Sequence, residues 1–304
     1  MRRVFLWMAR NPWLREHVPT WWFAKRAVRR FMPGERLEDA LVAAEAFTPS
    51  GITAFFTRLG ENLTDLAEAD AIAAHYLGAL DQIRSRGMDG EVSVKLTQLG
   101  LDLDPEVTRR HVATLATHAR ELGLGTVWID MEGSEYTEAT VALYEAMKPD
   151  HPNLGLCLQA YLKRTAADVT RLLPLQPAIR LVKGAYDEPA SIAYRTRSEV
   201  DASFVAQCIA LLREGTGLVG LGTHDVRLIE QIGAAAEAAG IGRDRYEVEM
   251  LYGIRGDELE RLAKAGYRAR VLIAYGEFWY PWYLRRLAER PANVTFVLRQ
   301  LLPW

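Results

Sequence analysis

The sequence predicts a single α/β domain of the (β/α)₈ barrel type, from the chain length and a repeating strand–helix pattern. The chain has 304 residues, of which 49% are hydrophobic, so it is long enough to form one large core. Short β-branched or apolar segments recur at a mean spacing of about 31 residues, which matches a barrel of roughly 250 residues. We expect eight strands, beginning at Ile52, Val92, Thr126, Gly155, Ile179, Leu218, Tyr246 and Ala269.

Helical patterns fill the intervals between these segments, for example over residues 105–123 and 229–240. Strands that alternate with helices indicate βαβ units and therefore a parallel sheet. An open, doubly wound parallel sheet is the alternative architecture.

The first 48 residues differ in composition from residues 49–304, which we assign to the barrel domain. Up to residue 36 there are nine arginines or lysines, against only Glu16 and Glu35. The same segment holds four of the eight tryptophans, namely Trp7, Trp13, Trp21 and Trp22. We expect a helical arm that packs its tryptophans on the barrel. Contact with an anionic membrane surface is the alternative interpretation.

The remaining composition excludes several classes of protein. A net charge of -2 does not favour nucleic-acid binding. Cys157 and Cys208 have no metal-ligand spacing and form no disulfide framework, and the histidines show no HxH or HExxH pair, so we expect no metal site. Because no apolar segment reaches about 18 residues and Arg10 interrupts any signal-peptide core, we expect a cytoplasmic protein. Peripheral contact at the inner face of the membrane stays open.

Polar residues alternate with apolar residues in the second to fifth expected strands. Alternate residues of a strand face opposite sides, and the apolar set must face the surrounding helices. Lys95, Asp130, Gln159 and Arg180 belong to the other set, so we expect them in the lumen, near the C-terminal strand ends. Barrel enzymes keep their active sites at this end, and buried charge is costly unless it is paired or used. An active site is therefore predicted, with a structural network of buried ion pairs as the alternative.

A segment near the C-terminus, residues 282–289, is helical in propensity and carries Arg285 and Arg286. Adjacent arginines can bind a carboxylate through paired hydrogen bonds. Together with Lys95, they would provide three cations around a small anion.

Seven segments now identify a resemblance to the monofunctional proline dehydrogenases. They are SVKLTQLGLDLD from Ser93, IDMEGSEYTEATVALYEA from Ile129, LCLQAYLKRT from Leu156, IRLVKGAYDEP from Ile179, GTHD from Gly222, EMLYGIR from Glu249 and RRLAERPAN from Arg285. The matches run in order from about Phe47 to the C-terminus and cover more than three quarters of the chain.

The resemblance implies a distorted barrel whose last helix lies across the top, over non-covalently bound FAD. Asp130 resembles the active-site aspartate, and Arg180 matches the arginine near flavin N5. The substrate-binding positions correspond to Lys95, Leu251, Arg285 and Arg286. The FAD-contacting positions correspond to Met131, Gln159, Lys183, Gly184, Ala185, Thr223 and His224. Glu61 resembles the partner of Arg285 in an ion pair that gates the site.

The implied reaction is the oxidation of L-proline to Δ1-pyrroline-5-carboxylate, the first step of proline catabolism to glutamate. Hydride transfer requires positioning more than acid–base chemistry, and a carboxylate anchor on a small ring supplies it. Arg180 would tune the redox potential of the flavin, and Asp130 is a candidate to organise loss of the amine proton. The electrons would pass to a quinone, and a separate pyrroline-5-carboxylate dehydrogenase would complete the pathway.

Three positions depart from the pattern of the family. Trp282 and Leu272 replace two tyrosines that commonly line the proline site, and Glu249 stands where glutamine is common. Tyr283 is displaced by one residue, about 100° around a helix, although a shift in register would still bring it to the pocket. A substituted proline or another cyclic amino acid is therefore an alternative substrate, and a flavin-free barrel lyase or aldolase is a second alternative.

Overall fold

The computed structural model describes residues 2–60 and 63–289. Within them, parallel strands β1 to β8 pair in sequence order and close into a barrel. The strands are β1 (Thr53–Arg58), β2 (Gly90–Val94), β3 (Val127–Ile129), β4 (Leu154–Gln159), β5 (Ala178–Val182), β6 (Val219–Gly222), β7 (Tyr246–Leu251) and β8 (Arg268–Tyr275). All eight expected strands are confirmed, and closure of β1 on β8 excludes the open sheet.

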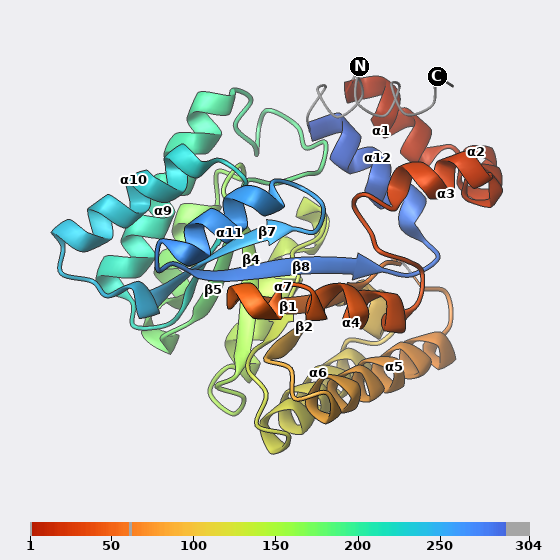
Figure 1. Ribbon diagram of the computed structural model, residues 1–304, viewed down its shortest axis with the longest axis horizontal. Helices are drawn as coiled ribbons and strands as arrows, with labels where there is room; N and C mark the ends of the chain where they lie inside the picture. The colour runs from red at the N-terminus through yellow and green to blue at the C-terminus, as the bar shows by residue number, and fades with distance from the viewer. Residues whose placement is uncertain (1, 61–62, 290–304) are drawn as a thin grey trace.

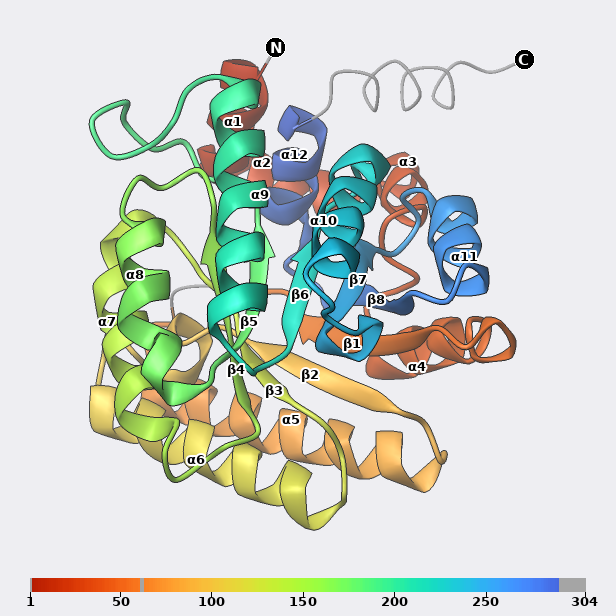
Figure 2. The same ribbon diagram turned by 90° about the vertical axis from the view of Figure 1, so that its left-hand side faces the viewer.

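Helices surround the barrel and connect its strands, as the alternating pattern predicts (Figures 1 and 2). The barrel helices are α4 (Leu37–Glu45), α5 (Leu66–Ser85), α6 (Pro105–Glu121), α7 (Ser134–Met147), α8 (Thr165–Leu172), α9 (Arg197–Glu214), α10 (Val226–Ala238) and α11 (Gly256–Lys264). Short 3₁₀ turns are η1 (Val18–Thr20), η2 (Thr48–Ser50), η3 (Thr97–Leu99), η4 (Leu173–Leu175) and η5 (Arg243–Arg245).

Local sequence signals explain where the long helices begin. Asp65 caps α5 by accepting a hydrogen bond from the N–H of Ala67, and Asp104 caps α6 in the same way, followed by proline at the first helical position. Thr196 and Glu199 form a reciprocal capping box at the start of α9. These caps satisfy backbone groups that the first turn of a helix leaves unpaired.

The two faces of each strand have different environments. The outward-facing set, such as Val92, Val94, Leu156 and Leu181, is buried against the helices in the main hydrophobic cluster. The opposite set places polar side chains inside the barrel, where Arg180 is only 2% exposed. This alternation confirms the expected division of strand residues between core and lumen.

The arm and the last helix form a second hydrophobic cluster beyond the C-terminal strand ends. The arm consists of α1 (Arg2–Arg10), α2 (Pro12–His17) and α3 (Trp22–Val28), and the last helix is α12 (Trp279–Glu289). In both ribbon views the strand arrowheads point towards α12 and the arm (Figures 1 and 2). Val28, Phe31, Tyr283 and Leu284 are buried in this cluster, so the arm covers the helix that carries Arg285 and Arg286.

The expectation that the arm packs its tryptophans on the barrel is wrong. Trp7, Trp13, Trp21 and Trp22 are 62, 55, 38 and 75% exposed. The arm instead attaches through smaller residues such as Ala9, Ala24 and Val28. In a short amphipathic helix one face suffices for attachment, which leaves the tryptophans on the other face in solvent. Among the described residues, no helix is long and apolar enough to span a membrane.

Candidate active site at the C-terminal ends of the strands

Arg180 is the centre of the polar lumen. Its Nη2 donates to Oδ1 of Asp130 at 3.0 Å and to Oγ of Ser93 at 2.7 Å. Ser93 in turn donates to the same Asp130 oxygen at 2.8 Å, so the three side chains form a closed triangle. The guanidinium lies over the rings of Phe55 and Trp128, with centroids 4.4 and 4.8 Å away. These contacts fix the direction of the guanidinium without any part of it reaching bulk water.

Glu249 approaches Arg180 from the other side. Its Oε2 lies 3.6 Å from Nε of Arg180, and both side chains are at most 3% exposed. Although burial alone would lower it, Glu249 and Asp130 together raise the pKa of Arg180. The guanidinium therefore stays charged, and two carboxyl groups from opposite sides of the barrel share it.

A second ion cluster lies deeper in the barrel, at the N-terminal ends of the strands. Arg270 contacts Glu247 at 3.0 Å and Glu91 at 3.5 Å. Glu91 also accepts hydrogen bonds from Nε1 of Trp128 and from the backbone N–H of Thr126. The alternative interpretation, a network of buried ion pairs, therefore holds for the deep half of the lumen, while Asp130 and Arg180 lie towards the end where barrel enzymes keep their active sites.

Lys95 and Gln159 lie at the rim above this triangle. Lys95 directly follows β2 and is 8% exposed. The side-chain amide of Gln159 donates weakly to the carbonyls of Met131 and Glu132, at 3.4 and 3.3 Å. Its Oε1 and the Nη1 of Arg180 are buried without a hydrogen-bond partner in the described chain. Unsatisfied buried groups are rare, so these two atoms indicate a ligand.

The loop after β5 carries the predicted cofactor residues Lys183, Gly184 and Ala185. Gly184 has a φ of 109°, and a Cβ there would lie 2.1 Å from the ring of Tyr161, so only glycine fits. Lys183 contacts Asp201 on α9 at 2.5 Å and Asp225 before α10 at 3.8 Å. As its strand parity predicts, Lys183 is therefore directed away from the lumen.

A cationic cluster surrounds Asp225. Arg197 and Arg227 contact the Asp225 carboxylate at 2.7 and 3.1 Å, next to Lys183. Although burial raises it, hydrogen bonds from these two arginines lower the pKa of Asp225 to about 2. Asp201 also belongs to this cluster, which therefore contains two carboxylates and the three cations Lys183, Arg197 and Arg227. The cluster thus has a net positive charge next to the C-terminal ends of β5 and β6.

Two predicted site residues, His224 after β6 and Leu251 at the end of β7, are joined by one hydrogen bond. The backbone N–H of Leu251 donates to Nε2 of His224 at 3.1 Å, so the ring proton of His224 is on Nδ1. Thr223 accepts from the N–H of Asp225. Leu251 remains partly exposed, as expected of an apolar pocket wall.

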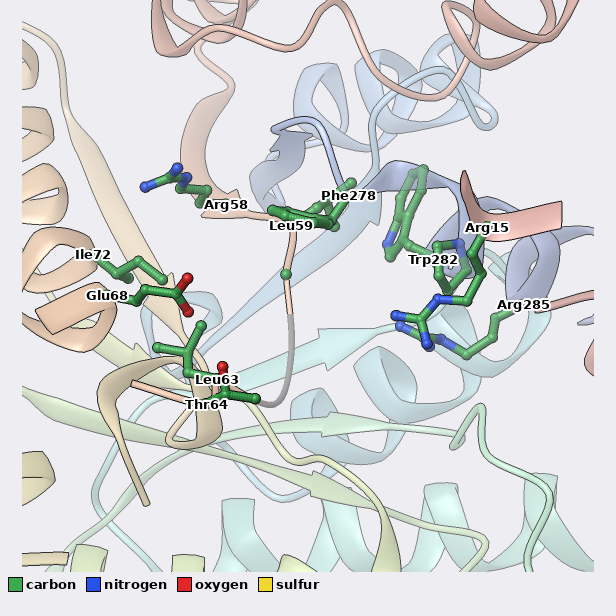
Figure 3. A pocket seen from close by; sticks show the side chains of 12 residues that line it. Arg15, Arg58, Leu59, Leu63, Thr64, Glu68, Ile72, Phe278, Trp282 and Arg285 are labelled. Carbon is green, nitrogen blue, oxygen red and sulfur yellow. The ribbon is translucent and has the colours of Figure 1, made fainter. Parts of the chain in front are cut away.

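Arg285 lines a pocket of about 270 Å³ between α12 and the loops after β1 and β8. Arg15 of the arm, Arg58 and Trp282 also line it, as Figure 3 shows. Arg285 also lies over the ring of Tyr186, 5.4 Å from its centroid. Arg286 is the next residue of the same helix. The predicted gate partner, Glu61, lies outside the described residues.

The structure locates the residues that depart from the family pattern. Trp282 is on the pocket side of α12. Trp282 and Tyr283 are both buried in the second cluster, but Tyr283 does not line the pocket, and its ring centroid lies 5.7 Å from that of Phe31. Leu272 is partly buried and packs against the same cluster. Tyr283 therefore does not take the place of Trp282.

Several residues of this region carry little signal in the sequence. Ser93 has the lumen parity of Lys95, and the structure shows that it joins Asp130 to Arg180. Arg15 belongs to the basic N-terminal segment and has no motif of its own. Asp201, Arg197 and Arg227 lie on surface-patterned helix starts, where charge is common, so no sequence signal singles them out.

Comparison with known proteins gives the family. The family model described as proline dehydrogenase matches residues 40–299. "Proline dehydrogenase 1" of Bacillus subtilis subsp. natto is 35% identical over 302 residues, covering 99% of both chains. "Proline dehydrogenase" of Deinococcus radiodurans is 34% identical over 278 residues, covering 90% of this chain and 89% of the relative.

Solved structures agree on the fold. Proline utilization A (PutA) of Bdellovibrio bacteriovorus, inactivated by N-propargylglycine, superposes with a TM-score of 0.80 at 22% identity. The match covers 87% of this chain and 32% of that protein. A nearly full-length match at more than 30% identity, together with the Asp130–Arg180 lumen, shows that the chain belongs to the proline dehydrogenase family.

Proposed function

We propose that this member of the proline dehydrogenase family oxidises L-proline to Δ1-pyrroline-5-carboxylate at the lumen above Arg180, with FAD as its cofactor. The observation that carries the proposal is the buried Asp130–Ser93–Arg180 triangle at the C-terminal ends of the strands. The rim holds Lys95, and α12 above it presents Arg285 and Arg286. Family membership supports the same chemistry.

The residues fit a flavin dinucleotide. Nη1 of Arg180 and Oε1 of Gln159 are buried polar atoms that have no partner in the described chain and would bind polar edges of a flavin ring. The surplus positive charge of Lys183, Arg197 and Arg227 suits the phosphates, as cationic groups do in general. Met131, Gly184, Ala185, Thr223 and His224 would complete the contacts. These residues would hold the flavin, which would supply the hydride acceptor.

The side chains of the protein position the substrate. Lys95, Arg285 and Arg286 would bind the proline carboxylate, and Leu251 would pack on the ring. Asp130 is held by Ser93 and Arg180 and would lie next to the substrate amine, where it could organise the loss of the amine proton. Glu61 would close the site through Arg285, excluding water during transfer.

The test is the visible spectrum of the purified protein before and after anaerobic L-proline. We expect an oxidised-flavin spectrum that is bleached by proline. A colourless protein that cannot be reconstituted with FAD would contradict the proposal and favour a flavin-free barrel lyase or aldolase.

The role of the arginines has its own test. Arg286→Ala should raise the proline KM by roughly ten- to hundred-fold, because a charged hydrogen bond contributes about 1.5–3 kcal/mol, while flavin content stays normal. Arg268→Ala is the control, since Arg268 lies at the opposite end of the barrel. An unchanged KM in Arg286→Ala would refute the carboxylate role.

A second candidate substrate follows from Trp282 and Leu272. A bulky ring on the pocket side of α12 and an apolar residue in β8 replace groups that could donate hydrogen bonds. A substituted proline or another cyclic amino acid would then be oxidised more efficiently than proline. Comparing anaerobic bleaching rates across a panel of such amino acids decides between them.

Electrons would leave to a membrane quinone, with the arm bound at the lipid surface. Trp7, Trp13 and Trp22 are more than half exposed, and the arm also exposes Arg15, Lys25, Arg26, Arg29 and Arg30. Interfacial aromatic rings with cations beside them suit anionic lipid. The arm adjoins α12, so binding there would bring the site to the membrane. Pyrroline-5-carboxylate would be consumed by a separate dehydrogenase.

Vesicle flotation tests the membrane contact. The protein should float with phosphatidylglycerol vesicles and much less with phosphatidylcholine vesicles, and salt should release it. The triple variant Trp7→Ser, Trp13→Ser, Trp22→Ser should lose binding, whereas Val42→Ser on exposed α4 should not. Failure to float, or self-association that the triple variant abolishes, would refute lipid as the partner.

A further inference from the structure

Three enclosed carboxyl groups share two enclosed guanidinium groups inside the barrel. Glu91, Glu247 and Glu249 are the carboxyl groups, with side chains at most 5% exposed, and Arg180 and Arg270 are the cations, each 3% exposed. Burial of an uncompensated charge is strongly unfavourable, so such a site tends to bind a proton. The three carboxyl groups differ in their hydrogen bonds.

Glu91 and Glu247 both accept hydrogen bonds, although burial also raises the pKa of the Glu91 carboxyl above its usual value. Glu91 accepts from Thr126 and Trp128 and contacts Arg270, and Glu247 accepts a hydrogen bond from Arg270 at 3.0 Å. Glu249 differs, because neither of its oxygens has a hydrogen-bond partner in the described part of the chain. One oxygen also lies directly over Gly220, where no side chain exists to donate.

Arg180 does not compensate Glu249 by itself. Its Nη2 is already hydrogen-bonded to Asp130 and Ser93, and the distance from Nε to Glu249 is 3.6 Å, beyond an ordinary hydrogen bond. The charged groups that act on Glu249 are Arg180 on β5, Glu247 on β7, Arg270 on β8 and Glu91 on β2. Asp130, which directly follows β3, and Cys157 on β4 act on Arg180. Burial raises the pKa of the Glu249 carboxyl well above its usual range, by more than the Arg180 guanidinium lowers it.

We propose that Glu249 is a neutral carboxylic acid behind Arg180, and that its protonation state sets how much of the Arg180 positive charge is available at the reaction site. Glu249 is thus a positioning residue that acts through Arg180. With the proton bound, Asp130 is the sole anion in hydrogen-bond contact with Arg180 among the described residues. When the proton leaves to solvent at high pH, a second carboxylate neutralises the guanidinium from behind.

The neutral state of Glu249 concerns the protein alone, whereas its effect on the reaction site rests on the flavin proposed above.

A neutral Glu249 makes the stability of the protein depend on pH in a definite direction. A carboxyl whose pKa is raised by folding contributes stability below its unfolded pKa, and this contribution is lost as the pH rises towards the folded pKa. The loss starts near pH 4.3, where an unfolded glutamate titrates.

The experiment compares the thermal unfolding of the flavin-free natural chain and of Glu249→Gln across pH. Glutamine mimics the neutral acid. The melting temperature of the variant should therefore rise relative to that of the natural chain by about 2 °C per pH unit above roughly pH 5. Glu247→Gln is the matched control from the same strand, and it should destabilise the protein at neutral pH because Arg270 loses a partner. A Glu249→Gln variant that is destabilised at neutral pH, with a pH-independent difference, would overturn the proposal.

Two further readouts complete the test. The infrared spectrum of the natural chain should contain the carbonyl stretch of a buried carboxylic acid at neutral pH, and Glu249→Gln should lack it. Absence of this band in the natural chain overturns the proposal even if the variant does not fold. In the flavin-loaded protein, the midpoint potential of the natural chain should fall below that of Glu249→Gln as the pH rises. If the carboxylic-acid band is present but the midpoint potentials of the natural chain and of Glu249→Gln change in parallel with pH, only the coupling of Glu249 to the flavin is refuted.

Discussion

Individual residues in the lumen owe their properties to the presence or absence of hydrogen-bond partners. Asp130 and Glu249 contact the same guanidinium, yet Asp130 accepts two hydrogen bonds and Glu249 accepts none in the described chain. The same contrast separates two buried tyrosines. Tyr76 accepts from the N–H of Arg58 and donates to the carbonyl of Ser93, whereas the Tyr283 hydroxyl has no partner among the described residues.

Tyr283→Phe should leave stability unchanged or raise it by about 1 kcal/mol, because it removes a buried, unsatisfied hydroxyl. The proline kcat/KM should not change, since Tyr283 packs on Phe31 rather than at the pocket. Denaturant unfolding and steady-state kinetics measure the two effects. Tyr76→Phe is the matched control and should lose about 1–3 kcal/mol. A fall in kcat/KM for Tyr283→Phe would mean that its hydroxyl reaches the substrate.

At the level of elements, each barrel strand has a stabilising end and a reacting end. Strand β8 shows this, with Arg270 in the deep ion cluster and Leu272 further along, next to the arm cluster. The N-terminal ends of barrel strands generally serve stability and the C-terminal ends serve chemistry. The fixed strand order explains why residues from β2, β3, β5 and β7 meet around one guanidinium.

Arg270→Ala should reduce the free energy of unfolding by about 3–5 kcal/mol, because Glu91 and Glu247 would be left buried without their cation. The proline KM should stay within a few-fold of the natural value. Chemical denaturation and kinetics at low temperature measure these quantities. Arg268→Ala, which removes a 47% exposed cation 3.6 Å from Glu247, should cost less than about 1 kcal/mol. Equal losses of unfolding free energy in Arg270→Ala and Arg268→Ala would disprove the special role of the enclosed ion cluster around Arg270.

For the whole molecule, the arm is the feature that joins the first and last parts of the chain. Its buried residues contact α12, so the helix that carries Arg285 and Arg286 is covered by a segment from the opposite end of the sequence. Helix α4 belongs instead to the main cluster around the barrel. The arm therefore stabilises the substrate end of the barrel without being part of it.

Removal of residues 1–36 should lower the melting temperature by more than about 5 °C, because Trp279, Tyr280, Tyr283 and Leu284 lose their cover. The proline KM should rise as α12 loses its support, while flavin binding persists through the lumen. Calorimetry, kinetics and the flavin-to-protein ratio measure these effects. Trp22→Ser on the exposed face of the arm should change none of them. A truncated chain with normal KM would show that α12 needs no support from the arm.

Much of the site could be predicted because strand parity is a local property. The alternation around Lys95, Asp130, Gln159 and Arg180 predicts the lumen, and in the structure Asp130 and Arg180 form a hydrogen bond there. Arg15 and Asp201 could not be found in this way. Each lies on a helix whose polar pattern fits simple solvent exposure, and only the folded chain brings them to Arg285 and Lys183.

The sequence by itself determined the barrel, its eight strands and the side of each strand that faces inwards, because periodicity and length are encoded within short segments. Only the tertiary structure decided which charges became partners. It left the tryptophans of the arm exposed, turned Tyr283 towards Phe31, and left Glu249 beside Arg180 without a hydrogen bond in the described chain. The physical reason is that the energy of a buried charge or ring depends on neighbours from distant segments, which no local pattern specifies.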